Sequence, residues 1–248
     1  MTWIKICGIT NLEDAQAAVE AGADALGFVF YEKSPRNTDP EVARAIIEKI
    51  PESVEKVGVF VDALGEEEVR IANHAWLTAL QRHLFLEMRP HDNKLYAMGC
   101  YWRPPKNYTC ISTKMLFENE DGVAAMTQNL LRVSEQILAA PGGDRKRVLD
   151  ALISAVFLDS GSIQQPGGTG KVFDWQRVLP MVDALRDRIK IVIAGGLNSS
   201  NVEECINLLH PWGVDVSSGV EEKPGKKDPK KIRAFVKAVR EADRRSAS

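Results

Sequence analysis

The sequence predicts an α/β fold of alternating strands and helices, arranged as one (β/α)8 barrel. Three observations support this class. Short apolar, β-branched runs alternate with segments of helical periodicity, as expected for parallel β-α-β units. About eight such units fit into the 248 residues, which is the usual size of a TIM barrel. No linker rich in Pro, Gly or Ser divides the chain, so residues 1–248 are expected to form a single domain. A doubly wound sheet is the alternative, although it usually has fewer strands.

The strands are predicted from short apolar runs that end at polar or glycine residues. The runs at 77–81 and 95–101 are the weakest of these signals. In chain order the predicted strands are 3–9, 25–31, 54–62, 77–81, 95–101, 155–159, 189–194 and 214–216.

The helices are predicted from apolar residues at helical spacing and from their end signals. Asn11 is expected to cap the first helix, with Asp14 three residues later, and Gly22 to end it in a left-handed conformation. Pro40 and Pro229 suit the first position of a helix, where the missing N–H has no consequence. The predicted helices are 12–21, 40–49, 66–74, 122–139, 174–187, 199–209 and 228–242, and residues 244–248 are expected to fray.

Residues 82–150 fit this scheme poorly. Strand signals are weak there, and the segment is longer than a simple β-α-β step requires. We expect either an elaborated barrel segment around strands 4 and 5 and the following helix, or a partly disordered insertion.

Composition excludes several classes of protein. Lys and Arg number 32 and Asp and Glu 34, so a net charge of −2 gives no footprint for nucleic acid. No run of about 18 apolar residues predicts a membrane span. The 4 cysteines lack C-x-x-C spacing, and the 4 histidines lack metal-ligand spacing, so no metal site is expected. The first residues lack the architecture of a signal peptide, which favours a reducing, cytoplasmic location.

The loops after the last two strands predict a phosphate pocket. Gly195 and Gly196 follow one strand, and Ser217, Ser218 and Gly219 follow the next. In a TIM barrel the site lies at the C-terminal ends of the strands, and phosphate usually binds at the last two loops. Adjacent glycines permit close approach of a ligand, and the next helix would direct its N-terminal amides there. A plain tight turn is the alternative explanation of the two glycines.

Cys7 lies near the end of the first predicted strand, just before a glycine. It is either a small buried hydrophobe or a base or nucleophile on the catalytic rim. Lys5 lies two residues earlier and therefore on the same face of the strand, where a cation would lower the pKa of the thiol.

Asp159 and Arg36 are the other two candidates on the rim. Asp159 ends an apolar strand and is either a turn or cap residue or a general acid. The glycines of 167–171 after it suit a mobile lid, and their spacing is not that of a P-loop. Arg36 is either a solvated surface residue or a bidentate ligand for a substrate carboxylate.

Several blocks of the chain, in this order, carry a family resemblance. They are 5–10 (KICGIT), 22–30 (GADALGFVF), 34–36 (SPR), 57–61 (VGVFV), 158–160 (LDS), 167–175 (GGTGKVFDW), 194–198 (AGGLN), 213–221 (GVDVSSGVE) and 224–228 (PGKKD). Over about 3–75 and 155–240, the chain resembles phosphoribosylanthranilate isomerase.

The resemblance implies a TIM-barrel aldose–ketose isomerase of tryptophan biosynthesis that needs no cofactor. Its reaction is the Amadori rearrangement of N-(5-phosphoribosyl)anthranilate to 1-(2-carboxyphenylamino)-1-deoxyribulose 5-phosphate. The substrate is a phosphosugar, no nucleic acid or membrane partner is implied, and the chain is expected to be a monomer or a homodimer. The family pattern implies these roles: Cys7 as general base, Asp159 as general acid, Arg36 on the anthranilate carboxylate, Gly195, Gly196, Ser217, Ser218 and Gly219 around the phosphate, and Asp215 at the border of the pocket.

The fourth strand departs from the family pattern. Where the family has Gln-Leu-His-Gly, residues 81–84 read Gln-Arg-His-Leu, and residues 85–113 match nothing expected. An unpaired arginine inside a barrel would be costly to bury. Two alternatives therefore stay open: a related phosphosugar barrel enzyme, and a barrel that binds phosphorylated ligands with impaired catalysis.

Overall fold

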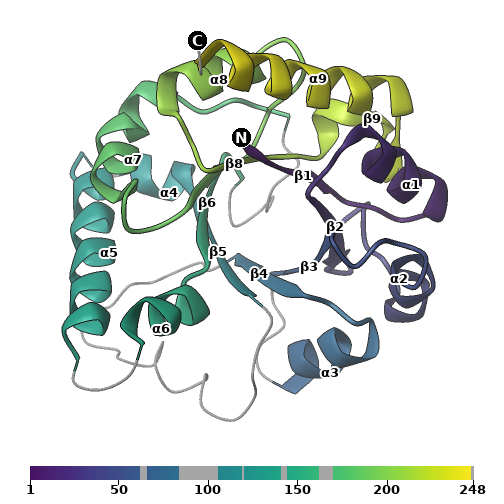
Figure 1. The fold of residues 1–248 in the computed structure, drawn as a ribbon, viewed down its shortest axis with the longest axis horizontal. Helices are drawn as coiled ribbons and strands as arrows, with labels where there is room; N and C mark the ends of the chain where they lie inside the picture. The colour runs from purple at the N-terminus through teal and green to yellow at the C-terminus, as the bar shows by residue number, and fades with distance from the viewer. Residues whose placement is uncertain (62–65, 84–105, 119, 141–143, 162–169, 247–248) are drawn as a thin grey trace.

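Eight parallel strands close into a barrel in the computed structural model, which describes residues 1–61, 66–83, 106–118, 120–140, 144–161 and 170–246. The strands follow one another around the barrel in chain order, and helices surround them (Figure 1). The predicted TIM-barrel class is confirmed. The extent of the domain, residues 1–248, stays a prediction.

The secondary structure alternates along the chain. The barrel strands are β1 (Trp3–Cys7), β2 (Ala25–Phe30), β3 (Glu55–Phe60), β4 (Ala79–His83), β5 (Lys106–Ser112), β6 (Ala155–Asp159), β7 (Ile191–Ile193) and β8 (Gly213–Val216). The helices are α1 (Leu12–Ala21), α2 (Pro40–Ile47), α3 (Glu66–His74), α4 (Thr113–Phe117), α5 (Gly122–Ala139), α6 (Arg145–Leu152), η2 (Trp175–Val178), α7 (Leu179–Leu185), α8 (Val202–Leu209), η3 (Ser218–Val220) and α9 (Pro229–Ser246). A small hairpin, β9 (Glu221–Lys223) and β10 (Lys226–Lys227), precedes α9.

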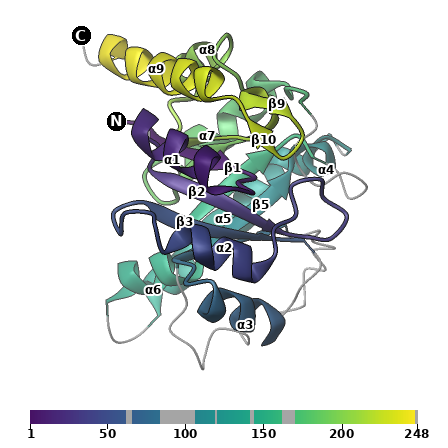
Figure 2. The same cartoon turned by 90° about the vertical axis from the view of Figure 1, so that its right-hand side faces the viewer.

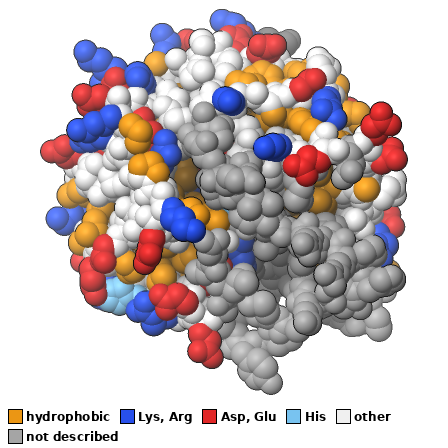
Figure 3. All heavy atoms as spheres, turned by 180° about the vertical axis from the view of Figure 1, so that it is seen from behind, with side chains coloured by type: hydrophobic (Ala, Val, Ile, Leu, Met, Phe, Trp, Pro, Cys, Tyr) orange, Lys and Arg blue, Asp and Glu red, His pale blue; other side chains and the backbone are white. Residues whose placement is uncertain are grey.

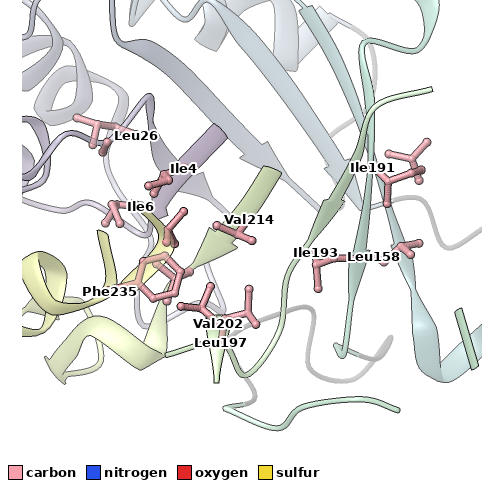
Figure 4. Packing of buried hydrophobic residues seen from close by; sticks show 14 of the residues in the cluster. Ile4, Ile6, Leu26, Leu158, Ile191, Ile193, Leu197, Val202, Val214 and Phe235 are labelled. Atoms are coloured by element: carbon pink, nitrogen blue, oxygen red, sulfur yellow. The ribbon is translucent and has the colours of Figure 1, made fainter. Parts of the chain in front are cut away.

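Both faces of the barrel strands are covered, one by the helices and the other by the interior of the barrel. Successive side chains along a strand point to these two faces in turn. Ile4 and Ile6 of β1 face outward and join the cluster that fills the space between barrel and helices, where Phe235 of α9 also packs (Figure 4). The alternate residues Lys5 and Cys7 belong to the inner face, which lines the barrel. One strand therefore supplies both the apolar core and the functional interior.

The barrel closes where β1 pairs with β8, with Lys5 opposite Asp215. Outside this seam, α9 lies against α1 and α8 (Figure 2). The backbone N–H of Thr2 donates to both oxygens of Asp243 of α9, at 3.0 Å each. The first and last described segments of the chain are thus held together.

Several predicted elements and caps are confirmed. The helix predicted at 122–139 and the strand predicted at 155–159 have the expected bounds. Asn11 caps α1 by accepting the N–H of Asp14 at 2.9 Å, and Gly22 ends the helix with φ of 96°. These ends depend on side chains within four residues of each other or on a single dihedral, which is why local sequence predicts them.

Other predictions were wrong or lie outside the described residues. β5 lies at Lys106–Ser112, and the strand predicted at 95–101 falls outside the described residues. The helices α4 and α6 in the atypical region were not predicted. The helix predicted from 199 begins at Val202, and α9 continues to Ser246 through residues expected to fray. Within 82–150, the described residues thus form regular strand and helices.

The surface carries mixed charge. Lys, Arg, Asp and Glu side chains are interspersed over the described part of the face seen in Figure 3. Among the described residues, no helix is long and apolar enough to cross a membrane.

Candidate active site

A pocket lies at the C-terminal ends of the barrel strands, where a TIM barrel is expected to bind its ligand. All the predicted site residues except Gly219 line it, and Gly219 follows directly after Ser218. The residues that line the pocket come from β1 to β4, β6 to β8 and the loops after them: Cys7, Val29, Tyr31, Ser34, Arg36, Val59, Val61, Gln81, His83, Asp159, Ala194, Gly195, Gly196, Leu197, Asp215, Ser217 and Ser218.

A buried ion pair between Lys5 and Asp215 lies beside this pocket, and Asp215 lines it. The Nζ atom of Lys5 donates to Oδ2 of Asp215 at 3.0 Å, and the Lys5 side chain is fully buried. Nζ also lies 5.4 Å from the centre of the Phe157 ring. Burial lowers the pKa of Lys5, but the charge of Asp215 and the neighbouring Cys7 outweigh it, so the pKa is raised. Lys5 is therefore a permanent cation inside the barrel.

The thiol of Cys7 shares this interior. A Cβ atom on Gly27 of the neighbouring strand would lie 2.7 Å from Sγ, so glycine there leaves room for the thiol. Burial raises the pKa of Cys7, and Lys5 lowers it by less, so the pKa lies above its ordinary value. The predicted cation is present and lowers the pKa of the thiol, but burial has the larger effect.

The carboxyl group of Asp159 has the properties of an acid. Burial raises its pKa, and the N–H of Gly161 and the charge of Lys5 only partly offset this effect. That N–H donates to Oδ1 of Asp159 at 2.6 Å. The contact resembles a turn interaction, so Asp159 fits both interpretations of its sequence position. A carboxyl group with a raised pKa keeps its proton to a higher pH and can donate it.

Arg36 enters the pocket but already binds a carboxylate of the protein. Its Nε and Nη2 atoms donate to Oε1 and Oε2 of Glu221 at 2.8 and 2.7 Å. Glu221 also accepts from Nζ of Lys227 at 2.9 Å. Arg36 thus binds a carboxylate with two nitrogens, as predicted, but this carboxylate belongs to Glu221 and occupies one edge of the guanidinium. Binding of a substrate carboxylate stays a prediction.

The glycines after β7 are required by neighbouring loops. Gly195 and Gly196 have φ of 80° and 69°. A Cβ atom on Gly195 would lie 2.6 Å from the backbone N of Ser160, and one on Gly196 would lie 2.5 Å from that of Val172. A Cβ atom on Gly219 would overlap the carbonyl oxygen of Leu197. Close packing of loops therefore accounts for these glycines without a ligand.

The N-terminus of α8 differs from the expected anion site. The N–H of Asn198 donates to the side chain of Asn201 at 2.9 Å, and that of Ser200 donates to the side chain of Asn198 at 2.8 Å. These amides are already bonded. The 3-10 helix η3 begins at Ser218, and the first N–H groups of a helix lack partners within it, so this turn is better placed to hold an anion.

Gln81 and His83 are site residues to which the sequence analysis assigned no role. Both face the pocket from β4, and Oε1 of Gln81 is buried without a hydrogen-bond partner in the described structure. Burial and the charge of Lys5 lower the pKa of His83 to about 4, so its imidazole is neutral. Side chains at every second residue share one face of a strand, so an inward Ala79 would have placed both of these side chains inside the barrel.

The same alternation resolves the question of the arginine in this strand. Arg82 does not line the pocket, and its Nε donates to Glu68 of α3 at 2.7 Å. Its charge is therefore paired outside the barrel. In the part of the chain that the structure describes, no group of three His, Cys, Asp or Glu side chains is placed to hold a metal ion.

The family model of N-(5'-phosphoribosyl)anthranilate isomerase matches residues 4–96 and 125–238. This is more of the chain than the sequence motifs covered, and it includes part of 85–113, which was expected to match nothing. The isomerase of Geobacter sp. (strain M21) is 40% identical over 95% of this chain and 97% of its own. That of Thermotoga neapolitana is 40% identical over 97% of this chain and 99% of its own.

Solved structures agree with the family match. The crystal structure of phosphoribosyl anthranilate isomerase from Thermotoga maritima superposes with a TM-score of 0.71 at 36% identity, covering 97% of this chain and 100% of that one. A structure of a phosphoribosyl anthranilate isomerase in complex with reduced 1-(o-carboxyphenylamino)-1-deoxyribulose 5-phosphate has a TM-score of 0.68 at 34% identity, with the same coverage. The chain belongs to the N-(5'-phosphoribosyl)anthranilate isomerase family.

Proposed function

We propose that this chain catalyses the isomerisation of N-(5'-phosphoribosyl)anthranilate to 1-(2-carboxyphenylamino)-1-deoxyribulose 5-phosphate in tryptophan biosynthesis. One observation carries the proposal: Asp159, with a raised pKa, and Cys7, beside a buried lysine, face the same pocket from β6 and β1. These strands are not neighbours in the barrel. The two groups can therefore act on different faces of a bound ribose.

Ring opening needs an acid. In this mechanism Asp159 donates its proton to the ring oxygen of the ribose while the bond from C1 to that oxygen breaks. The nitrogen lone pair forms the new C=N bond, so a protonated Schiff base results. The raised pKa of Asp159 supports this role, because a carboxyl group with an ordinary pKa would be almost fully ionised at neutral pH.

The second step needs a base. The Schiff base acidifies the hydrogen on C2, and the thiolate of Cys7 removes it to give an enolamine, which tautomerises to the ketone at C2. Because burial holds the pKa of Cys7 above its ordinary value, the thiolate is the minor form of the free enzyme. Lys5 stabilises this form more than Lys227 does.

Two anchors orient the substrate. Arg36 binds the anthranilate carboxylate with the guanidinium edge that Glu221 leaves open. The loops at Gly195, Gly196, Ser217, Ser218 and Gly219 surround the phosphate, and Asp215 holds Lys5 in place at the pocket border. Binding at both ends positions C1 and C2 between acid and base, which contributes to catalysis through orientation.

A fluorescence assay tests the activity. Freshly generated phosphoribosylanthranilate is mixed with the purified protein, and the anthranilate-type fluorescence is followed against the uncatalysed rate in protein-free buffer. We expect a rapid, saturable loss of fluorescence. A folded protein that binds the reduced product but shows no turnover would favour the alternative of a phosphosugar-binding barrel with impaired catalysis.

The setting of the enzyme is part of the proposal. We propose a cytoplasmic enzyme that works as a monomer or a homodimer, without a cofactor and without nucleic acid or membrane partners. One structural relative is a monomer generated from the dimeric isomerase of Thermotoga maritima. Sedimentation equilibrium of this chain across a range of concentrations would distinguish monomer from dimer.

A further inference from the structure

We propose that Glu221 and Lys227 are positioning residues, which aim Arg36 at the carboxylate of the substrate and tie this anchor to the phosphate loop. The inference rests on the proposed function and deepens it. Neither residue lines the pocket, so each would act through Arg36 or through Ser217.

The contact between Glu221 and Arg36 fixes the direction of the guanidinium. Glu221 is the first residue of β9, and its side chain is 4% exposed. Its two oxygens bind Nε and Nη2 of Arg36 side by side, at 2.8 and 2.7 Å. A bidentate pair fixes the plane of the fork as well as its distance. The Nη1 atom remains available for a second carboxylate.

Gly8 confines Arg36 from another side. It follows β1 with φ of 79°, and a Cβ atom on it would lie 2.6 Å from Cδ of Arg36 and 3.1 Å from Oγ of Ser217. The aliphatic part of Arg36 thus packs against bare backbone while Glu221 holds its end. Few other conformations are open to the side chain, so little entropy is lost when the substrate binds.

The charges of the three residues depend on one another. Arg36 and Lys227 are cations, Glu221 is the anion between them, and the Lys227 side chain is fully buried. Burial raises the pKa of Glu221, but the bonds and charges of Arg36 and Lys227 outweigh it, so the pKa is lowered and the group stays ionised at neutral pH. Burial lowers the pKa of Lys227, and the charge and hydrogen bond of Glu221 only partly offset this. With Lys227 protonated, the three groups carry one net positive charge. Without Glu221, two cations would face each other.

Lys227 connects this cluster to the phosphate loop. Besides Glu221, its Nζ lies 3.2 Å from the carbonyl oxygen of Ser217 and 3.4 Å from its Oγ. Its backbone N–H donates to Oδ2 of Asp14 at 2.7 Å, which anchors the hairpin to α1. The contacts therefore run from Arg36 through Glu221 and Lys227 to the residue that precedes η3.

Two ligands separate positioning from general structural support. One is the reduced product analogue, and the other is the same molecule without the carboxylate on its aromatic ring. Calorimetry would give the affinity of each ligand for the wild type and for Glu221→Gln. If Glu221 aims Arg36 at the carboxylate, the substitution weakens binding of the first ligand about tenfold or more, as loss of a charged hydrogen bond does, and leaves the second nearly unchanged.

Two further variants complete the experiment. Arg36→Met should show the same selective loss. Glu68→Gln is the matched control, because Glu68 is a buried carboxylate bonded to an arginine outside the pocket; it should bind both ligands as the wild type does. Should Glu221→Gln fail to fold, Glu221→Asp decides, since its side chain keeps the charge but is one methylene shorter and withdraws the carboxylate from both nitrogens.

The outcomes are distinct. Selective loss in Arg36→Met with equal affinities in the folded Glu221 variant would overturn this inference and leave the proposed function standing. Equal weakening of both ligands by the Glu221 variant would reduce its role to structural support and would also overturn the inference. If Arg36→Met itself fails to discriminate between the ligands, the carboxylate anchor of the proposed function is wrong.

Discussion

The two ends of the barrel interior differ in their side chains: one end is lined by aromatic rings and the other by titratable groups. Toward the N-terminal ends of the strands, Trp3, Tyr108 and Phe157 pack ring against ring, with centroids 5.3–6.2 Å apart. At the other end, Cys7 and Asp159 are buried and titratable. Phe157 and Asp159 are two residues apart on β6 and share its inner face. Along one face of a strand, the aromatic layer that stabilises the barrel and the layer of reactive groups are thus only two residues apart.

The largest effect expected at the reactive end is on turnover. Asp159→Asn keeps an oxygen that can accept the N–H of Gly161, but it removes the proton donor. We expect kcat to fall about 10²–10⁴-fold, the usual contribution of general acid catalysis. Steady-state kinetics with phosphoribosylanthranilate would measure it. An unchanged kcat would remove Asp159 from the mechanism.

Cys7→Ser is the corresponding test of the base. The hydroxyl fits the space beside Gly27, but it is a much weaker acid than a thiol and forms almost no alkoxide at neutral pH. We expect kcat to fall by about 10²-fold or more, with thermal stability little changed. Full activity in this variant would show that the base is another group.

The aromatic layer should show the opposite behaviour. Trp3, the first residue of β1, stacks on Trp212 with centroids 5.0 Å apart. Trp3→Ala is expected to lower the free energy of unfolding by about 3 kcal/mol. Thermal unfolding would detect this loss, and kcat of the folded enzyme should stay within about twofold of the wild type. A large fall in kcat would show that the two layers are coupled.

The pH dependence of stability should reveal the smallest effect. Because Asp159 has a raised pKa in the folded state, its protonated form stabilises the fold below the ordinary carboxyl pKa. This contribution is lost as pH rises through the raised pKa, so above that pKa the ionised group destabilises the protein. Asp159→Asn should therefore have a higher Tm than the wild type at pH 8, by about 2 °C or more, and the difference should shrink toward pH 4. A lower Tm for the variant at pH 8 would contradict the direction of this shift.

The reactive end was also the easier end to predict. Cys7, Asp159 and Gly195 each directly follow or end an apolar run, so local pattern places them at the ends of strands. β5 was missed because Lys106–Ser112 mixes polar and apolar residues on both faces. The helix α6 was missed because it begins with basic residues and has only a short apolar face.

Long-range partners could not be predicted from spacing. Arg36 and Glu221 are 185 positions apart, and only the closure of the barrel brings them together. The direction of the Cys7 pKa depends on how deeply the folded chain buries the thiol, which no local pattern reports. The sequence alone left open whether Arg82 points into the barrel, because a shift of the strand by one residue turns every side chain to the opposite face.

The pairing of Lys5 with Asp215 lies on the seam between the first and the last strand to be synthesised. Until β8 pairs with β1, Lys5 lacks its hydrogen-bonded counter-ion Asp215. The charge arrangement around the thiol is therefore absent until the ribosome has released β8. A chain that stops before β8 also lacks Ser217 and Ser218, which line the pocket, so the proposed chemistry requires closure of the ring.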